Sequence, residues 1–309
     1  MRTAVTFYAL ILCLPLTLKA QDIKESLEHD GRQRTFLVHL PKDYSEEKTY
    51  PLVIALHGGS GQAKVFNRGT GFRFNSLADE EGFILVYPQG VGKSWNDHPE
   101  REKRGKARKL NIDDVGFISA MIDDLASRYA VDITNVFACG ISNGGLMSLT
   151  LGADLPEKIK AVGLVSANFS KLKTDEMTDA QPFPVIIIHG TADPIFPYDE
   201  GEIRIFRQRR GHVLGAEKSI DFMCALNGNS TEGIITEMEN SNGRDGCTST
   251  RIVYPNAERP DLKVELIKIE GGGHTWPGGT QYLGKRLVGN VSRDQNACDL
   301  LWNFFKSLQ

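Results

Sequence analysis

The chain has 309 residues, of which 40% are hydrophobic and 24% are charged, and its formal net charge is −3. This composition is typical of a globular protein with a large core. It excludes an intrinsically disordered chain and a globally basic protein that binds nucleic acid. After about residue 20, no apolar run approaches the ~20 residues that a membrane-spanning helix needs, so we expect no membrane domain.

The first twenty residues differ from the rest of the chain. Arg2 provides a positive charge, residues 4–18 are almost wholly apolar, and Ala20 is a small residue of the kind that signal peptidase prefers. We predict a signal peptide over residues 1–20 and a single domain over residues 21–309, secreted to the extracellular space or the periplasm. A retained anchor is the alternative, which the short apolar stretch disfavours.

Short apolar runs alternate with helix-like segments along the chain. The predicted strands span residues 33–40, 52–56, 83–87, 136–139, 161–165, 185–189 and 264–269. Several are continuously apolar, as expected of strands buried on both faces of a parallel sheet. Helical periodicity follows Asp113 and Asp114 as far as residue 129, and it returns over residues 297–305. The pattern predicts an α/β three-layer sandwich with a mostly parallel sheet.

Two segments depart from this alternation. Residues 94–109 are rich in lysine and arginine, and a solvated loop is favoured there over a grip on an acidic polymer. Residues 199–262 are polar and predict a small insertion, in which a disulfide between Cys224 and Cys247 is the favoured pairing. Cys139 lies within a predicted strand and is expected to be a buried free thiol.

A glycine-flanked serine stands between a predicted strand and a predicted helix. The stretch FACGISNGGLMSL covers residues 137–149 and contains Gly140, Ser142 and Gly144 as Gly-x-Ser-x-Gly. On a sharp strand-to-helix turn, a nucleophilic serine needs glycines on both sides so that neighbouring backbones can approach without a Cβ clash. The pattern therefore predicts Ser142 as a nucleophile, the alternative being an inert serine in a glycine-rich corner.

A nucleophilic serine requires a base, and the base requires a carboxylate that orients it. Asp193 follows the strand 185–189, and His274 follows the strand 264–269 on a glycine-rich loop. The chain order Ser142, Asp193, His274 is that of α/β-hydrolases. His57 and His189 precede glycine at strand ends and are predicted to be structural.

The oxyanion hole is expected to combine two backbone N–H groups. One belongs to Asn143, directly after the nucleophile, and the other to Gly59 in LHGGSGQ, with Ser60 as the alternative. The clustered cysteine and histidine spacing of a zinc site is absent from the sequence, so we expect neither a metal nor a cofactor.

Several motifs carry a resemblance to a known family. LHGGSGQ, YPQG with SWN, DDVGFI, GISNGG, HGTADPIFPY and GGGHTWPGG resemble the secreted polyhydroxybutyrate depolymerase and feruloyl esterase group, from about residue 34 to the C-terminus. The resemblance implies an α/β-hydrolase fold with the Ser142, Asp193, His274 triad. It also implies that Trp95, Asn96 and Trp276 lie near the cleft and bind substrate, the alternative for each tryptophan being packing under a loop.

The predicted function is a serine esterase that removes feruloyl-type or acetyl groups from plant polysaccharide through an acyl-enzyme. Only about 20 residues separate the strands that end at residue 165 and begin at residue 185, so we expect an open cleft without a large lid. The expected partners are polysaccharide-linked or small esters, with no nucleic acid and no membrane. The alternatives are an aliphatic polyester depolymerase, a peptidase and a non-catalytic carbohydrate-binding protein.

Overall fold

A computed structural model describes residues 22–97, 105–205 and 208–309, with the side chain of residue 210 left out. The predicted signal peptide lies outside these residues, and so does the middle of the basic segment 94–109. Within the described residues, no helix combines the length and the apolar character needed to cross a membrane.

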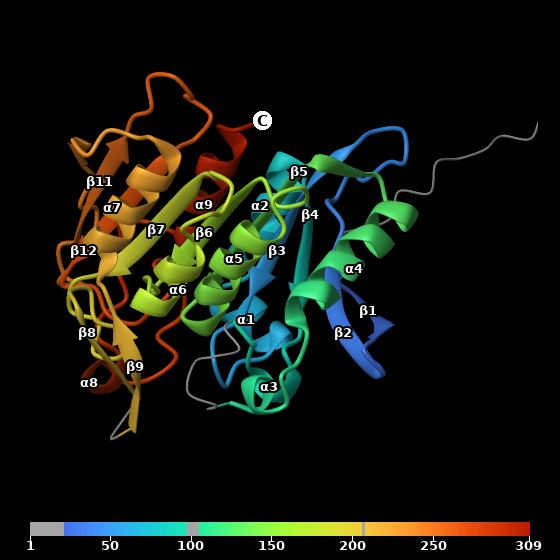
Figure 1. Cartoon of the computed structure of the whole chain (residues 1–309), viewed down its shortest axis with the longest axis horizontal. Helices are drawn as coiled ribbons and strands as arrows, with labels where there is room; N and C mark the ends of the chain where they lie inside the picture. The colour runs from blue at the N-terminus through green and yellow to red at the C-terminus, as the bar shows by residue number, and fades with distance from the viewer. Residues whose placement is uncertain (1–21, 98–104, 206–207) are drawn as a thin grey trace, which may run out of the picture.

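A ten-stranded sheet runs through the molecule in the order β1-β2-β4-β3-β5-β6-β7-β12-β11-β10 (Figure 1). Neighbouring strands are parallel from β4 to β12, while β1, β2, β11 and β10 extend the two sides with antiparallel pairing. The strands are β1 (Asp22–His29), β2 (Arg32–His39), β3 (Tyr50–Leu56), β4 (Ile84–Pro88), β5 (Val131–Ile141), β6 (Ala161–Val165), β7 (Val185–Gly190), β10 (Ile234–Glu237), β11 (Thr248–Tyr254) and β12 (Val264–Glu270).

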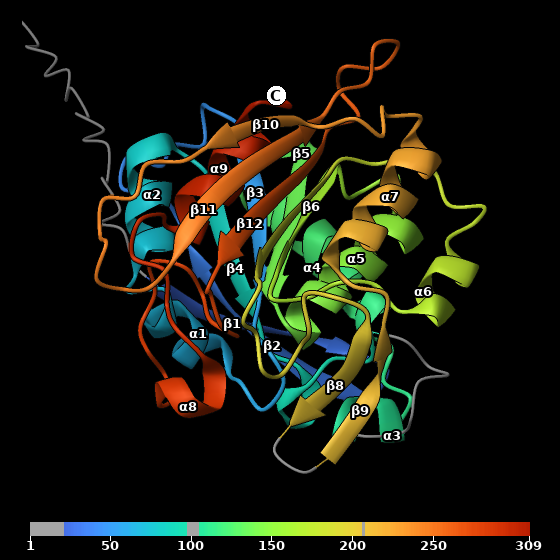
Figure 2. The ribbon, with the colours of Figure 1, turned by 90° about the vertical axis from the view of Figure 1, so that its left-hand side faces the viewer.

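Helices cover both faces of the sheet and enclose two hydrophobic clusters. On one face lie α4 (Asp114–Arg128), α5 (Asn143–Asp154) and α7 (Ala216–Asn227), and on the other lie α1 (Ala63–Gly69), α2 (Arg73–Glu81) and α9 (Ala297–Lys306). Figure 2 shows the sheet between these two layers. The prediction of a three-layer α/β sandwich with a mostly parallel sheet is confirmed.

All seven predicted strands are present, with ends that differ by a few residues. Strands β4, β6 and β7 are buried along their whole length, because helices pack on both sides of the central sheet. Between β6 and β7 the chain forms the short helix α6 (Lys171–Glu176) and no large lid.

The polar segment 199–262 is mostly not an insertion, contrary to the prediction. Helix α7 packs into the core, and β10 and β11 complete one side of the main sheet. Only β8 (Gly201–Ile205) and β9 (Gln208–Val213) form a separate two-stranded sheet.

The predicted disulfide between Cys224 and Cys247 is not formed. Cys224 lies on α7 in the core cluster on one face of the sheet, and Cys247 belongs to the cluster on the other face. Cys139, Cys224, Cys247 and Cys298 are all buried free thiols. Their separation along the chain suited a disulfide, but the sheet lies between the two residues.

Candidate active site

Ser142 stands at the junction of β5 and α5. Its backbone has φ 57° and ψ −121°, a conformation that a residue with a Cβ rarely adopts and that marks functional turns. The Ser142 N–H donates to the Val165 carbonyl at 2.9 Å, which ties the turn to the end of β6. The hydroxyl is half-buried and makes no hydrogen bond within the described part of the chain. It is therefore free to rotate toward a base or a substrate.

The flanking glycines are required by the close approach of β3. A Cβ on Gly140 would lie 2.6 Å from the Leu56 carbonyl oxygen, and a Cβ on Gly144 would lie 2.6 Å from the His57 carbonyl oxygen. Both distances are shorter than any ordinary van der Waals contact. The glycines thus allow the Ser142 turn to pack against the end of β3, as the motif predicts.

Asp193 and His274 form a buried pair on the loops that follow β7 and β12. The distance from His274 Nδ1 to Asp193 Oδ2 is 2.8 Å. The other carboxylate oxygen, Oδ1, accepts the N–H groups of Ile195 and Phe196 at 2.8 and 2.7 Å. These contacts hold the Asp193 carboxylate in one orientation.

Asp193 is ionised in this environment. Burial would raise its pKa, but the attraction of His274 and the hydrogen bonds from His189 and His274 lower the pKa well below its usual value. An ionised carboxylate can only accept, so His274 Nδ1 carries a proton, and in the neutral imidazole the lone pair is on Nε2. Nε2 is the nitrogen that a general base would use.

His274 is fixed through its backbone by a segment that the sequence did not single out. Its N–H donates to the Val288 carbonyl at 2.6 Å, and its carbonyl accepts the Tyr282 hydroxyl at 3.0 Å. On the nucleophile side, Ser166 follows the strand β6 that anchors Ser142, and the Ser166 hydroxyl donates to the Thr275 carbonyl at 3.2 Å. The end of β6 therefore contacts both sides of the site: Val165 binds the Ser142 N–H, and the next residue, Ser166, binds Thr275 on the His274 loop.

The loop after β3 is organised by His57. Its Nε2 accepts the Gly90 N–H at 3.0 Å, so the proton is on Nδ1, which donates to the Gly58 carbonyl at 2.8 Å. Burial lowers the pKa of His57 to about 4, and the ring is neutral at pH 7. The structural role predicted for His57 is thus to shape the glycine loop.

The same loop distinguishes the two candidate oxyanion donors. The Ser60 N–H donates to the Lys93 carbonyl at 2.7 Å, whereas the Gly59 N–H forms no such backbone bond within the described residues. Gly59 also lies against α5, since a Cβ built on it would be 3.8 Å from the Asn143 Cβ. Gly59 is therefore the donor that remains available beside Asn143.

A family profile described as "Putative esterase" matches residues 28–197, which include Ser142 and Asp193. The chain belongs to this esterase family. It is a carboxylic-ester hydrolase, as the sequence predicts.

The esterase is similar to several named proteins. It is 30% identical over 281 residues to "Putative esterase NocK" of Nocardia uniformis subsp. tsuyamanensis, covering 89% of this chain and 79% of the relative. It is 28% identical over 247 residues to "Feruloyl esterase B" of Piromyces equi, covering 78% of this chain but only 42% of the relative. Among solved structures, the acetyl xylan esterase from Aspergillus awamori matches with a TM-score of 0.58 and 15% identity, over 82% of this chain and 94% of that one. This last likeness shows the fold.

The two tryptophans predicted to bind substrate lie in the interior of the esterase instead. Trp95 is 0% exposed, and its indole N–H donates to the His57 carbonyl at 2.8 Å. Trp276 is 4% exposed and packs edge-on against Phe66 at a ring-centroid distance of 5.1 Å. Neither ring presents a face to a substrate, so both predictions of direct contact are wrong for this structure.

Asn96 is half-buried and its hydrogen bonds are with the protein. Its N–H donates to Asp114 Oδ2 at 2.7 Å, and its side-chain Nδ2 donates to the Ile112 carbonyl at 2.9 Å. Asp113 caps α4 as expected, by accepting the Gly116 N–H at 2.8 Å, while Asp114 holds this loop. Asn96 therefore holds its own loop against the start of α4.

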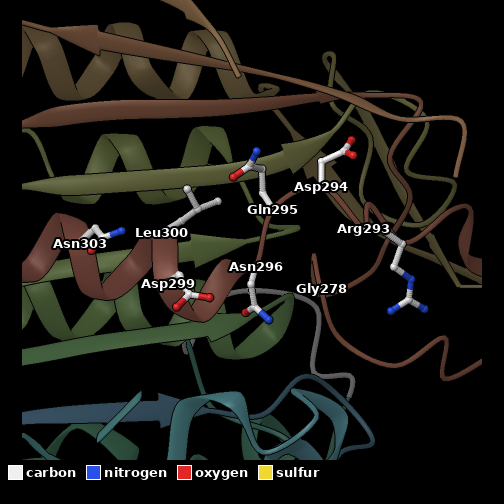
Figure 3. Close-up of a pocket in the computed structure, with 8 residues that line it drawn as sticks. All are labelled: Gly278, Arg293, Asp294, Gln295, Asn296, Asp299, Leu300 and Asn303. Atoms are coloured by element: carbon white, nitrogen blue, oxygen red, sulfur yellow. The ribbon is translucent and has the colours of Figure 1, made fainter. Parts of the chain in front are cut away.

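A polar hollow of about 410 Å³ is lined by residues other than those of the candidate triad (Figure 3). It is formed by the turn before α9 and by the first part of that helix. Its side chains point in different directions, and Asp299 is paired with Arg73. The hollow therefore lacks the convergent groups of a catalytic site.

Proposed function

We propose that this protein is a secreted serine esterase that releases feruloyl-type or acetyl groups from plant polysaccharide. The observation that carries the proposal is the buried pair of Asp193 and His274, together with the strained turn of Ser142 at the end of β5. A carboxylate, a correctly protonated imidazole and a serine on a sharp turn are the parts that acyl transfer requires.

The reaction proceeds in two displacements. In the first, Ser142 Oγ attacks the ester carbonyl while His274 Nε2 takes the hydroxyl proton, and the Asn143 and Gly59 N–H groups stabilise the oxyanion. His274 then gives the proton to the departing alkoxide, which leaves as an alcohol on the polysaccharide. In the second, His274 removes a proton from water, the resulting hydroxide attacks the acyl-serine, and the carboxylic acid leaves as Ser142 regains its proton.

The substrate class rests on the relatives and on the open connection after β6. The Piromyces relative is named a feruloyl esterase, and a Neocallimastix patriciarum relative, 26% identical over 271 residues, is named a bifunctional acetylxylan esterase/xylanase. The chain spans 42% and 32% of their lengths. A short α6 between β6 and β7 leaves room for a bulky ester, and the leader-like residues 1–20 support secretion.

An aliphatic polyester is the second candidate substrate. Beside the backbone of His274, the segment that carries α8 (Lys285–Val288) exposes Tyr282, Leu283 and Leu287 by 49%, 42% and 46%. Exposed apolar side chains next to a catalytic residue are what a hydrophobic polymer would contact.

The experiment that separates these substrates compares methyl ferulate, p-nitrophenyl acetate and a film of polyhydroxybutyrate. Ser142→Ala is assayed in parallel as the blank. We expect Ser142-dependent release of ferulate and acetate and little loss of film mass. Loss of film mass without hydrolysis of methyl ferulate would favour the polyester. Turnover that persists in Ser142→Ala would overturn the serine mechanism.

A further inference from the structure

Three segments that follow strands β3, β4 and β12 surround the candidate site and share one property. They are residues 57–72, residues 88–97 with 105–111, and residues 275–291. Within the described chain they carry one acidic residue, Asp97, which is paired with Arg108. Their other charged side chains are all basic: Lys64, Arg68, Lys93, Lys106, Lys109, Lys285 and Arg286.

These seven basic residues, here called the basic rim, are exposed and have no carboxylate partner among the described residues. Many other cations of the molecule are paired, for example Arg34 with Asp114 and Arg251 with Glu265. The chain as a whole has a net charge of −3, so the basic rim is opposite in sign to the net charge of the molecule. Lysines and arginines left unpaired on one edge produce a field that attracts anions.

The basic rim is joined to the candidate site by hydrogen bonds and packing. The Lys93 carbonyl accepts the Ser60 N–H beside Gly59, and the stem of Lys106 lies over Gly92, where an added Cβ would be 2.7 Å from Lys106 Cδ. The Gly69 carbonyl at the end of α1 accepts the Thr280 N–H at 2.9 Å, which connects α1 to the loop before α8. Figures 1 and 2 both place α1, α8 and α3 (Lys106–Lys109) at the same end of the molecule.

The positive surface continues past α8 into a hollow of about 320 Å³. Arg244, Lys285 and Arg293 line it. Asp245 also lines it, but its carboxylate already accepts the N–H groups of Cys247 and Arg293 at 2.8 and 2.6 Å. The hollow therefore has three cationic side chains and one carboxylate, and its lining is positive on balance.

We infer that the esters hydrolysed by this protein are carried by an acidic polysaccharide, one whose sugar units bear carboxylates. The inference rests on the proposed function, because it names the substrate class of the same site. The cations are exposed and spread over three segments and an outlying hollow. A single carboxylate on a small acyl group would need only one or two cations next to Ser142, whereas a polyanion contacts all of them.

The test uses matched substrates that carry the same acetyl ester. One is an acetylated galacturonic acid oligomer and the other an acetylated neutral xylo-oligomer, each assayed at 20 and 300 mM NaCl. We expect kcat/KM for the acidic oligomer to fall about tenfold with salt, because salt screens exposed charges, and kcat/KM for the neutral oligomer to stay nearly constant. An equal response of both substrates would overturn the inference.

Two triple variants distinguish the effect of the basic rim from the effect of removing any three positive charges. The triple change Lys64→Gln, Lys106→Gln, Lys285→Gln takes one cation from each segment, and we expect it to raise KM for the acidic oligomer about tenfold. The matched control Lys24→Gln, Lys42→Gln, Lys48→Gln removes three exposed lysines from β1 and from the β2–β3 connection, none of which has a carboxylate partner in the part of the chain that the structure describes. An equal loss in both triples would contradict a role for the basic rim.

Two further measurements show which part of the substrate carries the recognised carboxylate and whether the proposed esterase activity is present. A preference for p-nitrophenyl succinate over p-nitrophenyl acetate, without any preference between the oligomers, would place the recognised carboxylate on the acyl group and overturn the polymer assignment. If neither oligomer nor p-nitrophenyl acetate shows Ser142-dependent turnover, the proposed function itself fails. Ser142-dependent turnover of both oligomers with no effect of salt would instead leave the proposed function in place and overturn only the inference of an acidic polysaccharide.

Discussion

Trp95 and Asn143 hold each other by two hydrogen bonds. The Trp95 N–H donates to Asn143 Oδ1 at 2.8 Å, and Asn143 Nδ2 donates to the Trp95 carbonyl at 3.2 Å. Asn143 follows the candidate nucleophile, and Trp95 supports the loop of His57. The residue after the nucleophile thus has two roles: its backbone is the proposed oxyanion donor, and its side chain holds the loop that shapes the other donor.

Asn143→Ala is expected to lower kcat/KM by about 10²-fold, because a displaced donor loop loses its fit to the transition state. Stability should fall by about 1–3 kcal/mol, since the Trp95 N–H is left without a partner. Steady-state kinetics and urea unfolding measure both effects. Asn135→Ala, in the first half of β5, is the control, and equal kinetics in the two variants would contradict the role of the Asn143 side chain.

Trp276→Leu is expected to act on stability and not on substrate binding. The buried ring packs against Phe66 and Phe74, and loss of such a core aromatic costs about 3 kcal/mol. KM for p-nitrophenyl acetate should be unchanged. Tyr282→Ala, at an exposed residue beside His274, should show the reverse, with altered KM and little change in stability. A raised KM with unchanged stability for Trp276→Leu would restore its predicted contact with substrate.

The central strands were predictable because burial on both faces leaves a continuous apolar run, as in β4, β6 and β7. The outer strands β1 and β10 were missed for the opposite reason: β1 alternates between exposed and half-buried residues, and β10 is exposed throughout. A strand at the side of a sheet needs fewer apolar residues. Its sequence therefore resembles that of a loop.

The contact between Asp193 and His274 was predictable from chain order and strand ends, because the parallel strands β7 and β12 end at the same edge of the sheet. The two tryptophans were not, since sequence does not say whether an aromatic residue on a loop faces solvent or the core. Tyr282 gave no signal at all, because its contact is with the backbone of His274 and no motif surrounds it.

The stability of the protein is expected to fall in acid partly through His57. Its pKa is about 4 in the folded protein and about 6.5 when unfolded, so between these values only the unfolded chain binds the proton. The contribution is fully present above pH 6.5 and is lost toward pH 4, by at most about 3 kcal/mol. Urea unfolding between pH 4.5 and 8 should show this decline, and His57→Gln should flatten it.

The pKa of His39 is shifted in the opposite direction to that of His57, so its contribution to stability has the opposite pH dependence. Burial disfavours its charged form, but the hydrogen bonds and charges of Asp22 and Asp79 raise its pKa above the usual value. Its stabilising contribution is present below pH 6.5 and is lost as the pH rises through the raised pKa. His39→Gln should therefore change the stability profile above pH 6.5 and leave the acid decline in place. Identical profiles for the two variants would contradict both assignments.

The four cysteines after residue 20 are expected to remain thiols in the purified protein. Burial raises the pKa of all four, to about 12 for Cys224 and about 11 for Cys247, so reactive thiolates are scarce. Ellman titration in guanidinium of a chain that begins at Gln21 should give four thiols, and reductant should not change the melting temperature. Two thiols and a melting temperature lowered by reductant would indicate a disulfide.

The central claim is that Ser142 forms the acyl-enzyme with His274 as its base. The most direct test is intact-mass spectrometry after treatment with a fluorophosphonate, beside turnover of methyl ferulate by wild type, Ser142→Ala and His274→Ala. We predict one adduct on Ser142 in the wild type, no adduct in Ser142→Ala, strongly slowed labelling in His274→Ala, and kcat reduced by about 10⁴-fold or more in both variants. Labelling and turnover that survive the loss of Ser142 would contradict the account.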